Sequence, residues 1–532
     1  MHFALGLIDV IIIAGSILLV VVVGLLASRN QDKTARGYFL ASGKLPWYII
    51  GAAFVSTSVS SEQIVGTIGA AYKHGMGIAN WEWWTLPTYS LLLVVFIPIY
   101  LRNRVTTVPE LLSRRFGPLC ADIYSWVMLF AYVVVFMVSI LYGGSIAFSK
   151  LTGWDFHAVL WCTTVLIGIY AVKGGLRSVM FTDAVQCLLL VAGGMMLFFV
   201  ALGRIPGGWA AMQQASPERF HLYHPVDDPI APFPVLILGS LGVFLFYQSS
   251  NQVMIQRVLG ARSIWDGMMG IIFAGFINLF RPLVTCFLGM IVYHWVYVMR
   301  AAPHLENQDA TFSFALGHFA PSWGLRGFVL AGFIAAVMSA TSALANSTAT
   351  IFSLNVYQRL LSKPASERSL VAVGRIASGT SLAAAACIAP AVARMGGIFP
   401  YFQTGVTYIS TPFISVMILG VLWRRANYQG ALFGLIGGIA IMATIGLGAP
   451  LLGFGTHWLY LAAIAQAITM VGIVVVSLMT PAPDRKQWEP FLWNRGLLRA
   501  YDEGMRRPRY QSLKLWFALY ALVWFYLYWR FW

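Results

Sequence analysis

Two apolar stretches of the chain are interrupted in their middle by polar residues that could bind a small solute. The first interruption runs from Ser56 to Gln63, and the second runs from Tyr247 to Gln252. Hydroxyl and amide groups at this depth of an apolar segment are costly in lipid unless they line a cavity enclosed by protein. These groups donate and accept hydrogen bonds, so the chemistry they offer is the binding of a solute or an ion.

Ionisable and amide residues within other apolar stretches add to this polar set. Asn278 and Arg281 are three residues apart and therefore share one helix face. Arg281 could neutralise a carboxylate such as Glu62 or Glu82, or it could hold an anionic substrate; we favour the structural pairing. The intramembrane polar candidates outside the two interruptions are Glu82, Asp183, Asn278, Arg281, Ser339, Thr341, Ser342 and Gln403.

The composition requires these residues to be positioned by membrane helices. Hydrophobic residues make up 59% of the 532 positions, and charged residues make up only 10%. This balance excludes a soluble multidomain enzyme and is typical of a polytopic helical membrane protein. Because about 20 apolar residues cross a bilayer, the chain has room for a dozen or more helices, and we treat residues 1–532 as one transmembrane domain.

Apolar runs bounded by charges, Pro or Gly predict about fourteen transmembrane helices. The fold class predicted is therefore an all-α polytopic membrane protein. The predicted spans lie near residues 6–27, 45–72, 81–101, 124–149, 158–172, 180–202, 233–255, 266–298, 327–357, 370–392, 399–423, 430–449, 458–479 and 514–531.

The distribution of Lys and Arg gives the predicted helices an orientation. The seven alternate loops that begin near residues 28, 102, 173, 256, 358, 424 and 480, counted together with basic residues near the ends of the adjoining spans, hold 26 of the 35 basic residues. The opposite set holds 8, and Arg281 lies within a span. Cytoplasmic loops carry this excess, so both termini are predicted to lie outside a plasma or inner membrane. The net charge of +16 is thereby explained without a nucleic-acid partner.

The two polar interruptions occupy corresponding helices of two five-helix halves. This arrangement points to a transporter built from inverted repeats, with its binding site at the membrane midplane. The predicted division is a leading helix at 6–27, a first repeat at 45–202, a second repeat at 233–423 and accessory helices at 430–532. The cytoplasmic linker at 480–513 is basic and is expected to contact anionic lipid headgroups.

Five segments, taken in order, resemble the sodium/solute symporter family, whose best-known members are the sodium/glucose cotransporters and their bacterial homologues. The resemblance covers nearly the whole chain. It implies a LeuT-type core of two inverted five-helix repeats, with one helix before it and three after it. The segments are Tyr38–Trp47, Ser61–Gln63, Thr107–Gly117, Gly174–Gln186 and Asn346–Thr350.

The resemblance also implies a solute site between the two broken helices. Gln63, Glu82, Tyr247 and Gln403 match positions that contact the sugar or stack on it in the family's sugar transporters. Three positions depart from the family pattern, since Ser58 replaces an asparagine, Phe244 replaces a polar residue and Asn278 replaces a lysine. With Arg281 one turn beyond Asn278, an acidic sugar or another carboxylate stays among the candidate solutes.

The sodium site implied by the resemblance lies between the first broken helix and the ninth span. Backbone carbonyls of Ser56, Val59 and Ala336 and the hydroxyl of Ser339 would bind the ion, but the second expected hydroxyl is replaced by Ala340. A hard cation needs several oxygen ligands, so Ser60, Thr341 or a water would have to supply the missing one. Asp183, with Thr57 and Ser342, is the candidate for a second ion site.

These observations predict a secondary active transporter that couples a cation, most simply Na+, to the symport of a sugar or sugar-like solute. Three alternatives stay open: a proton-coupled carrier, an uncoupled carrier of an acidic sugar or carboxylate, and a solute sensor of the same fold that does not transport. The polar set contains no nucleophile–base pair, so no enzyme activity is expected. The expected partners are a small solute and membrane lipids, with no nucleic acid and no obligate protein partner.

Overall fold

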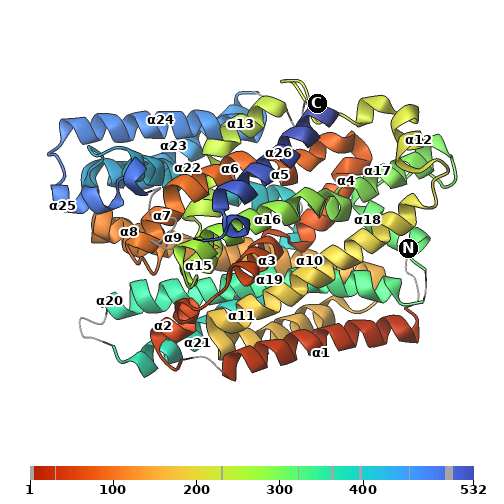
Figure 1. Ribbon diagram of the computed structural model, residues 1–532, viewed down its shortest axis with the longest axis horizontal. Coiled ribbons are helices and arrows are strands. Elements are labelled where there is room, and N and C mark those ends of the chain that lie inside the picture. Colours follow the sequence, from red (N-terminus) through yellow and green to blue (C-terminus); the bar gives the residue numbers. More distant parts are fainter. Residues whose placement is uncertain are drawn as a thin grey trace.

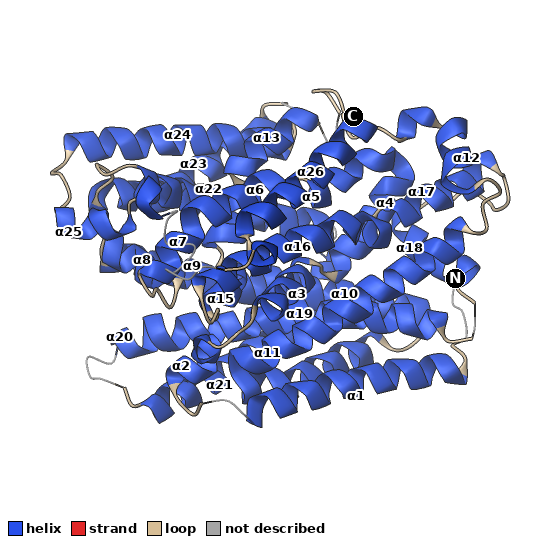
Figure 2. Ribbon diagram, in the orientation of Figure 1, coloured by secondary structure: helices blue, strands red, loops and turns tan. Residues whose placement is uncertain are grey.

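The computed structural model describes residues 5–29, 32–228, 232–321, 323–360, 365–394, 398–453, 456–497 and 507–532. Within these ranges the chain is helical, and its only β-type pairing is a single bridge between Leu45 and Ala261 (Figure 2). The long helices lie roughly along the longest axis of the molecule (Figure 1). The predicted fold class, an all-α polytopic protein, is confirmed.

The helices follow one another with short connections. In the amino-terminal half they are α1 (Leu7–Arg29), α2 (Ala35–Leu40), α3 (Trp47–Ser58), α4 (Ser61–His74), α5 (Asn80–Trp83), α6 (Thr85–Leu91), α7 (Ile97–Arg102), α8 (Val108–Arg115), α9 (Pro118–Phe130), α10 (Val138–Thr152), α11 (Phe156–Leu202), α12 (Gly208–Ala215), α13 (Phe233–Leu241), α14 (Val243–Leu245) and α15 (Gln252–Leu259). In the carboxy-terminal half they are α16 (Ile264–Thr285), α17 (Phe287–Tyr293), α18 (Thr311–Phe319), α19 (Leu325–Ile351), α20 (Gln358–Leu360), α21 (Glu367–Ile388), α22 (Ile398–Leu422), α23 (Tyr428–Leu451), α24 (Trp458–Met479), α25 (Arg485–Trp488) and α26 (Leu513–Phe531).

Ten helical segments in the described part of the chain are long and apolar enough to cross a membrane, or eleven if the bent pair α13–α14 with its following turn is one span. The predicted count of fourteen is therefore not confirmed as a number. Three features make the difference: α3 is short because it ends at a break, α11 contains two predicted spans, and α26 is rich in Tyr and Trp. Tyr and Trp carry a polar group and favour the membrane interface. Their number in α26 lowers the mean hydropathy of this helix.

The 47-residue helix α11 is bent at Gly175, where φ is +55° and ψ is −157°. At a rise of 1.5 Å per residue, a straight helix of this length would be about 70 Å long, more than twice the ~30 Å hydrocarbon core. The bend therefore separates the two spans predicted at 158–172 and 180–202. A side chain at this position would clash, since a Cβ on Gly175 would lie 2.4 Å from the carbonyl oxygen of Tyr38.

The centre of the molecule is formed by α3, α11, α16 and α19. Helix α11 packs along α19, α1 and α3, and α16 packs along α3; Figure 1 shows α1 beside α11 at the lower edge of the view. The start of α16 is capped by Ser263, whose hydroxyl accepts from the backbone N–H of Asp266 at 3.0 Å. Asp266 in turn accepts from the backbone N–H of Trp47 at 3.1 Å, so one cap fixes the starts of both α16 and α3.

Candidate solute and ion site

The first broken helix is interrupted at Val59 and Ser60, as the sequence predicted. Both residues are extended, with φ and ψ of −109° and 119° at Val59 and −123° and 169° at Ser60. Helix α3 therefore ends at Ser58, and α4 begins at Ser61. Carbonyl groups at a helix end and N–H groups at a helix start have no partners within the helix, so this break can offer both acceptors and donors to a bound ligand.

The second broken helix is also interrupted where predicted, and protein side chains bind the polar groups at its end. A π-helical turn, Phe246–Ser250, ends at Asn251, which is extended. Three tyrosine hydroxyls from neighbouring segments hold this end: Tyr100 donates to the carbonyl of Ser249 (2.8 Å), Tyr124 to the carbonyl of Ser250 (2.6 Å) and Tyr132 to Oδ1 of Asn251. The sequence analysis did not identify these tyrosines, whose only signal was a hydroxyl within an apolar run.

A cavity of about 1050 Å³ lies between the two broken helices. It reaches the protein surface beside the exposed residues Lys150, Asn307 and Asp309. Towards the other side of the first break the protein is closed, since Ser56 and Thr57 are 0% and 3% exposed. Five predicted solute-binding residues line this cavity: Ser58, Gln63, Tyr247, Asn278 and Arg281.

The remaining two predicted solute-binding residues lie elsewhere. Glu82, in α5, is fully buried and lies behind Arg281 rather than in the cavity wall, with its Oε2 2.8 Å from Nε of Arg281. Gln403 lies in α22, and its side chain is outside the described part of the structure. The structure therefore places Arg281 in the pairing with a carboxylate that the sequence analysis favoured.

Arg281 is held by Glu82 of α5, by Ser58 of α3 and by Asn278 of its own helix, α16. Its Nη1 donates to Oγ of Ser58 at 3.1 Å and to Oδ1 of Asn278 at 3.3 Å. Asn278 also donates to the hydroxyl of Tyr89 at 2.8 Å. These contacts connect the end of α3 to α16 directly at the break.

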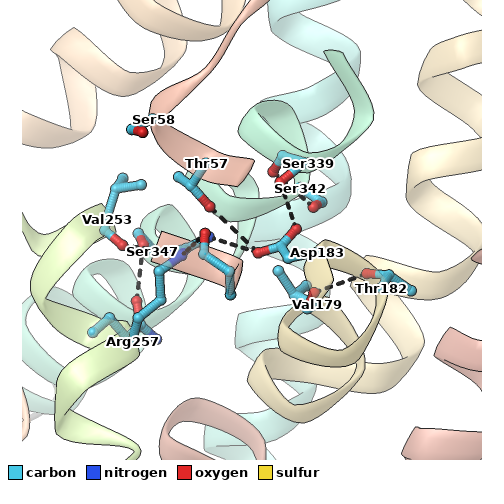
Figure 3. Close-up of polar contacts among 12 residues, drawn as sticks. Thr57, Ser58, Val179, Thr182, Asp183, Val253, Arg257, Ser339, Ser342 and Ser347 are labelled. Atoms are coloured by element: carbon cyan, nitrogen blue, oxygen red, sulfur yellow. Dashed lines mark hydrogen bonds and ion pairs between the residues drawn. The ribbon is translucent and has the colours of Figure 1, made fainter. Parts of the chain in front are cut away.

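The predicted residues of the second ion site form a buried cluster around Asp183 (Figure 3). Oδ1 of Asp183 accepts from the hydroxyl of Ser339 at 2.7 Å, and Oδ2 accepts from the hydroxyl of Thr57 at 3.3 Å. Ser342 does not reach the carboxylate by a hydrogen bond in the structure; its hydroxyl donates to the carbonyl of Ser339 at 3.0 Å. The cluster thus links α3, α11 and α19.

Arg257 completes this cluster, and its position corrects the sequence analysis. The prediction that a loop begins near residue 256 is wrong, because α15 continues to Leu259. Arg257 is 1% exposed. Its Nη2 donates to Asp183 at 3.0 Å, and its other nitrogens donate to the backbone carbonyls of Ala53 and Val253. A buried carboxylate needs such a partner, which is the signal that could have identified Arg257.

The predicted sodium ligands lie around the first break. Ser56, Val59, Ala336 and Ser339 are all buried. A small cavity of about 20 Å³, close to the space that a single water needs, is lined by Thr57, Ser60 and Ala340 among other residues. Two buried hydroxyls, those of Ser56 and Thr341, have no hydrogen-bond partner within the described ranges. The donor set is composed of oxygen atoms, which suits a hard cation.

Comparisons with known proteins identify the family. The model of the sodium:solute symporter family matches residues 38–438. The chain belongs to the sodium:solute symporter family. It is 30% identical over 508 residues to a sodium/glucose cotransporter of Vibrio parahaemolyticus, with 90% of this chain and 92% of the relative covered. It is 29% identical to the human sodium/myo-inositol cotransporter, with 92% and 75% covered.

A solved structure shows which fold this family member has. A Na+-coupled sialic acid symporter in a substrate-bound, outward-open state superposes with a TM-score of 0.80 at 20% identity. The match covers 90% of this chain and 99% of the solved one. The resemblance inferred from the sequence segments is therefore confirmed, together with the sodium-symporter fold. The relatives named here are transporters, and the chain is a multi-pass membrane protein.

Proposed function

We propose that this protein is a secondary active transporter that couples the entry of Na+ to the symport of a sugar or sugar-like polyol by alternating access. The observation that carries the proposal is the cavity of about 1050 Å³ that joins both broken helices and is lined by Ser58, Ser60 and Ser61 at the first break. The names of the glucose and myo-inositol cotransporters, which align with 90% and 92% of this chain, support the same function.

The residues of the cavity have the groups that a polyol requires. Gln63 and Asn278 offer paired amide donors and acceptors, and the ring of Tyr247 offers an apolar face for one side of a sugar. The start of α4 adds backbone N–H donors at the same wall. Gln403, from the resemblance, is proposed as a further contact.

Sodium is proposed to bind on the side of the first break away from the solute cavity, between the end of α3 and α19. The carbonyls of Ser56, Val59 and Ala336 and the hydroxyl of Ser339 would supply ligands there, and the negative end of the α3 dipole favours a cation. Thr57, Asp183 and Ser342 are proposed as a second site that responds to the first through Ser339. In this scheme Na+ is carried with the solute and is not a resident cofactor.

The orientation and organisation complete the proposal. The cavity opens at the end of the molecule that the basic residues assign to the outside, so the conformation is outward-facing. Residues 45–202 and 233–423 form the two repeats, and the basic linker at 480–513 contacts lipid on the cytoplasmic side of a plasma or inner membrane. No enzyme activity and no obligate protein partner are part of the scheme.

Uptake into proteoliposomes tests the coupling. Radiolabelled D-glucose and myo-inositol are offered with an inward Na+ gradient, with K+ in its place, and with a proton gradient at fixed Na+. Accumulation above equilibrium only with the Na+ gradient is expected. Equal uptake under all three conditions would favour an uncoupled carrier, uptake driven by the proton gradient would favour proton coupling, and solute binding without any net flux would favour a sensor.

A further inference from the structure

Arg281 is a cation in the wall of the solute cavity, yet most of its donors are already in use. Nη1 donates to both Ser58 and Asn278, at 3.1 and 3.3 Å. Nε lies in ion-pair contact with Glu82, 2.8 Å from Oε2, without hydrogen-bond geometry, so this carboxylate covers the Nε side of the guanidinium. The side chains of Arg281 and Glu82 are 6% and 0% exposed. Among its described contacts, only Nη2 is left for a solute.

This arrangement prevents the strongest way of binding a carboxylate. A guanidinium binds a carboxylate best through two parallel N–H groups on one edge. The two edges available are Nε with Nη2 and Nη1 with Nη2; the Glu82 carboxylate covers the first at Nε, and Ser58 and Asn278 accept from Nη1 of the second. Arg281 can therefore offer a solute the two N–H groups of Nη2, which lie on different edges and suit hydroxyl oxygens, but no free parallel pair for a carboxylate.

The charges around the cavity lead to the same conclusion. Glu82 neutralises Arg281 from the side away from the cavity. At the rim, Lys150 and Asp309 have opposite charges. A carboxylate entering this site would lose its hydration without meeting a net positive charge.

We infer that Glu82, by occupying and neutralising Arg281, makes the site select uncharged polyhydroxylated solutes over their carboxylated analogues. This inference rests on the proposed symport function and narrows its substrate class. Glu82 does not touch the solute; it is a positioning residue that acts through Arg281. Asn278 replaces the lysine that the family resemblance leads one to expect. It belongs to the same network, because its Oδ1 accepts from Arg281.

The experiment compares D-glucose and myo-inositol with D-glucuronate, which differs from glucose by its carboxylate. Sodium-driven uptake is measured in proteoliposomes for the native protein, Glu82→Gln, and the double variant Glu82→Gln/Arg281→Met. Native protein is expected to take up glucuronate poorly. In Glu82→Gln, the ratio of glucuronate to glucose uptake is expected to rise by about ten-fold or more, the size of a charge-assisted hydrogen bond. The double variant should lose that gain, because the gain requires the freed guanidinium.

A second measurement needs no variant and covers the case in which Glu82→Gln does not fold. Unlabelled glucuronate is tested as a competitor of labelled glucose on native protein, and it should compete at least about ten-fold more weakly than unlabelled glucose. Equal competition, or a parallel fall of both uptakes in folded Glu82→Gln, would overturn the inference while leaving symport in place. If neither neutral solute shows Na+-dependent uptake, the proposed function itself fails.

Discussion

Single residues decide the electrostatics of the membrane core through two buried ion pairs. Asp183 pairs with Arg257, and Glu82 pairs with Arg281, at 3.0 and 2.8 Å. In each pair the arginine also donates to groups at or next to the first broken helix. A buried charge without a partner is strongly destabilising, so each pair constrains the geometry of the break as well as its charge.

Removal of the Asp183 carboxylate is expected to destabilise the protein more than removal of one of its neutral donors. Asp183→Asn leaves Arg257 buried without a counter-charge, a cost of about 3–5 kcal/mol. Thr57→Val removes one hydrogen bond, at 3.3 Å, a cost of about 1–2 kcal/mol. Thermal unfolding in detergent should show a clearly larger fall in Tm for Asp183→Asn. Similar shifts for the two variants would contradict the role given to the ion pair.

Ala340 is the residue at which the ion site departs from the family pattern. It lines the small cavity beside Thr57 and Ser60. Ala340→Ser adds an oxygen ligand there, and the Na+ concentration that gives half-maximal uptake should fall, by several-fold for an added ligand worth about 1 kcal/mol. Ala335→Ser, on a different face of α19, serves as the control and should leave that concentration unchanged. No change with Ala340→Ser would place the ion elsewhere.

At the scale of elements, the two broken helices differ in what lies against the polar groups at their breaks. Tyrosine hydroxyls bind the end of the second helix, whereas the first break faces the large cavity on one side and the small one on the other. The carboxyl end of α4 is fixed by Arg219, which donates to the carbonyls of Ala71 (3.1 Å), Tyr72 (2.7 Å) and Lys73 (3.2 Å). The carbonyls of Tyr72 and Lys73 are among those that a helix end leaves without helical partners, whereas that of Ala71 also accepts from the N–H of Gly75.

Arg219→Met should loosen this last turn of α4. The variant loses three hydrogen bonds, each worth about 1 kcal/mol, and the guanidinium contact 3.5 Å above the ring of Tyr293. Hydrogen–deuterium exchange of residues 69–74 should become faster, and Tm should fall. Arg204→Met, also between α11 and α13 and exposed, is the matched control. Unchanged exchange in Arg219→Met would show that the turn is held by other contacts.

At the scale of the whole molecule, the loops fall at two opposite ends. Figure 1 places α8, α20 and α25 at the left end, and α12 with both termini towards the right. The loops that contain α8, α20 and α25 were predicted to be cytoplasmic. Their gathering at one end agrees with the alternation of basic residues along the sequence.

Labelling from outside the cell tests this orientation. The two exposed native cysteines, Cys162 and Cys387, are first replaced by alanine. In intact cells a membrane-impermeant maleimide should label Glu218→Cys, because residue 218 is predicted to lie outside. Lys486→Cys should be labelled only after the membrane is permeabilised. The reverse pattern would invert the proposed topology and place the cavity opening on the cytoplasmic side.

The sequence by itself determined the class of fold, the family and the positions of both breaks. Polar runs such as Ser56–Gln63 cannot face lipid in any packing arrangement, so their placement in the protein interior follows from the sequence alone. The tertiary structure decided which polar groups meet. Arg257 was assigned to a loop, and the partner of Arg281 was left open, because each pairing joins different helices and depends on how those helices are rotated against each other. Asp183 and Arg257 are 74 residues apart, and only the packing of α11, α15 and α19 brings that carboxylate, its arginine and Ser339 together.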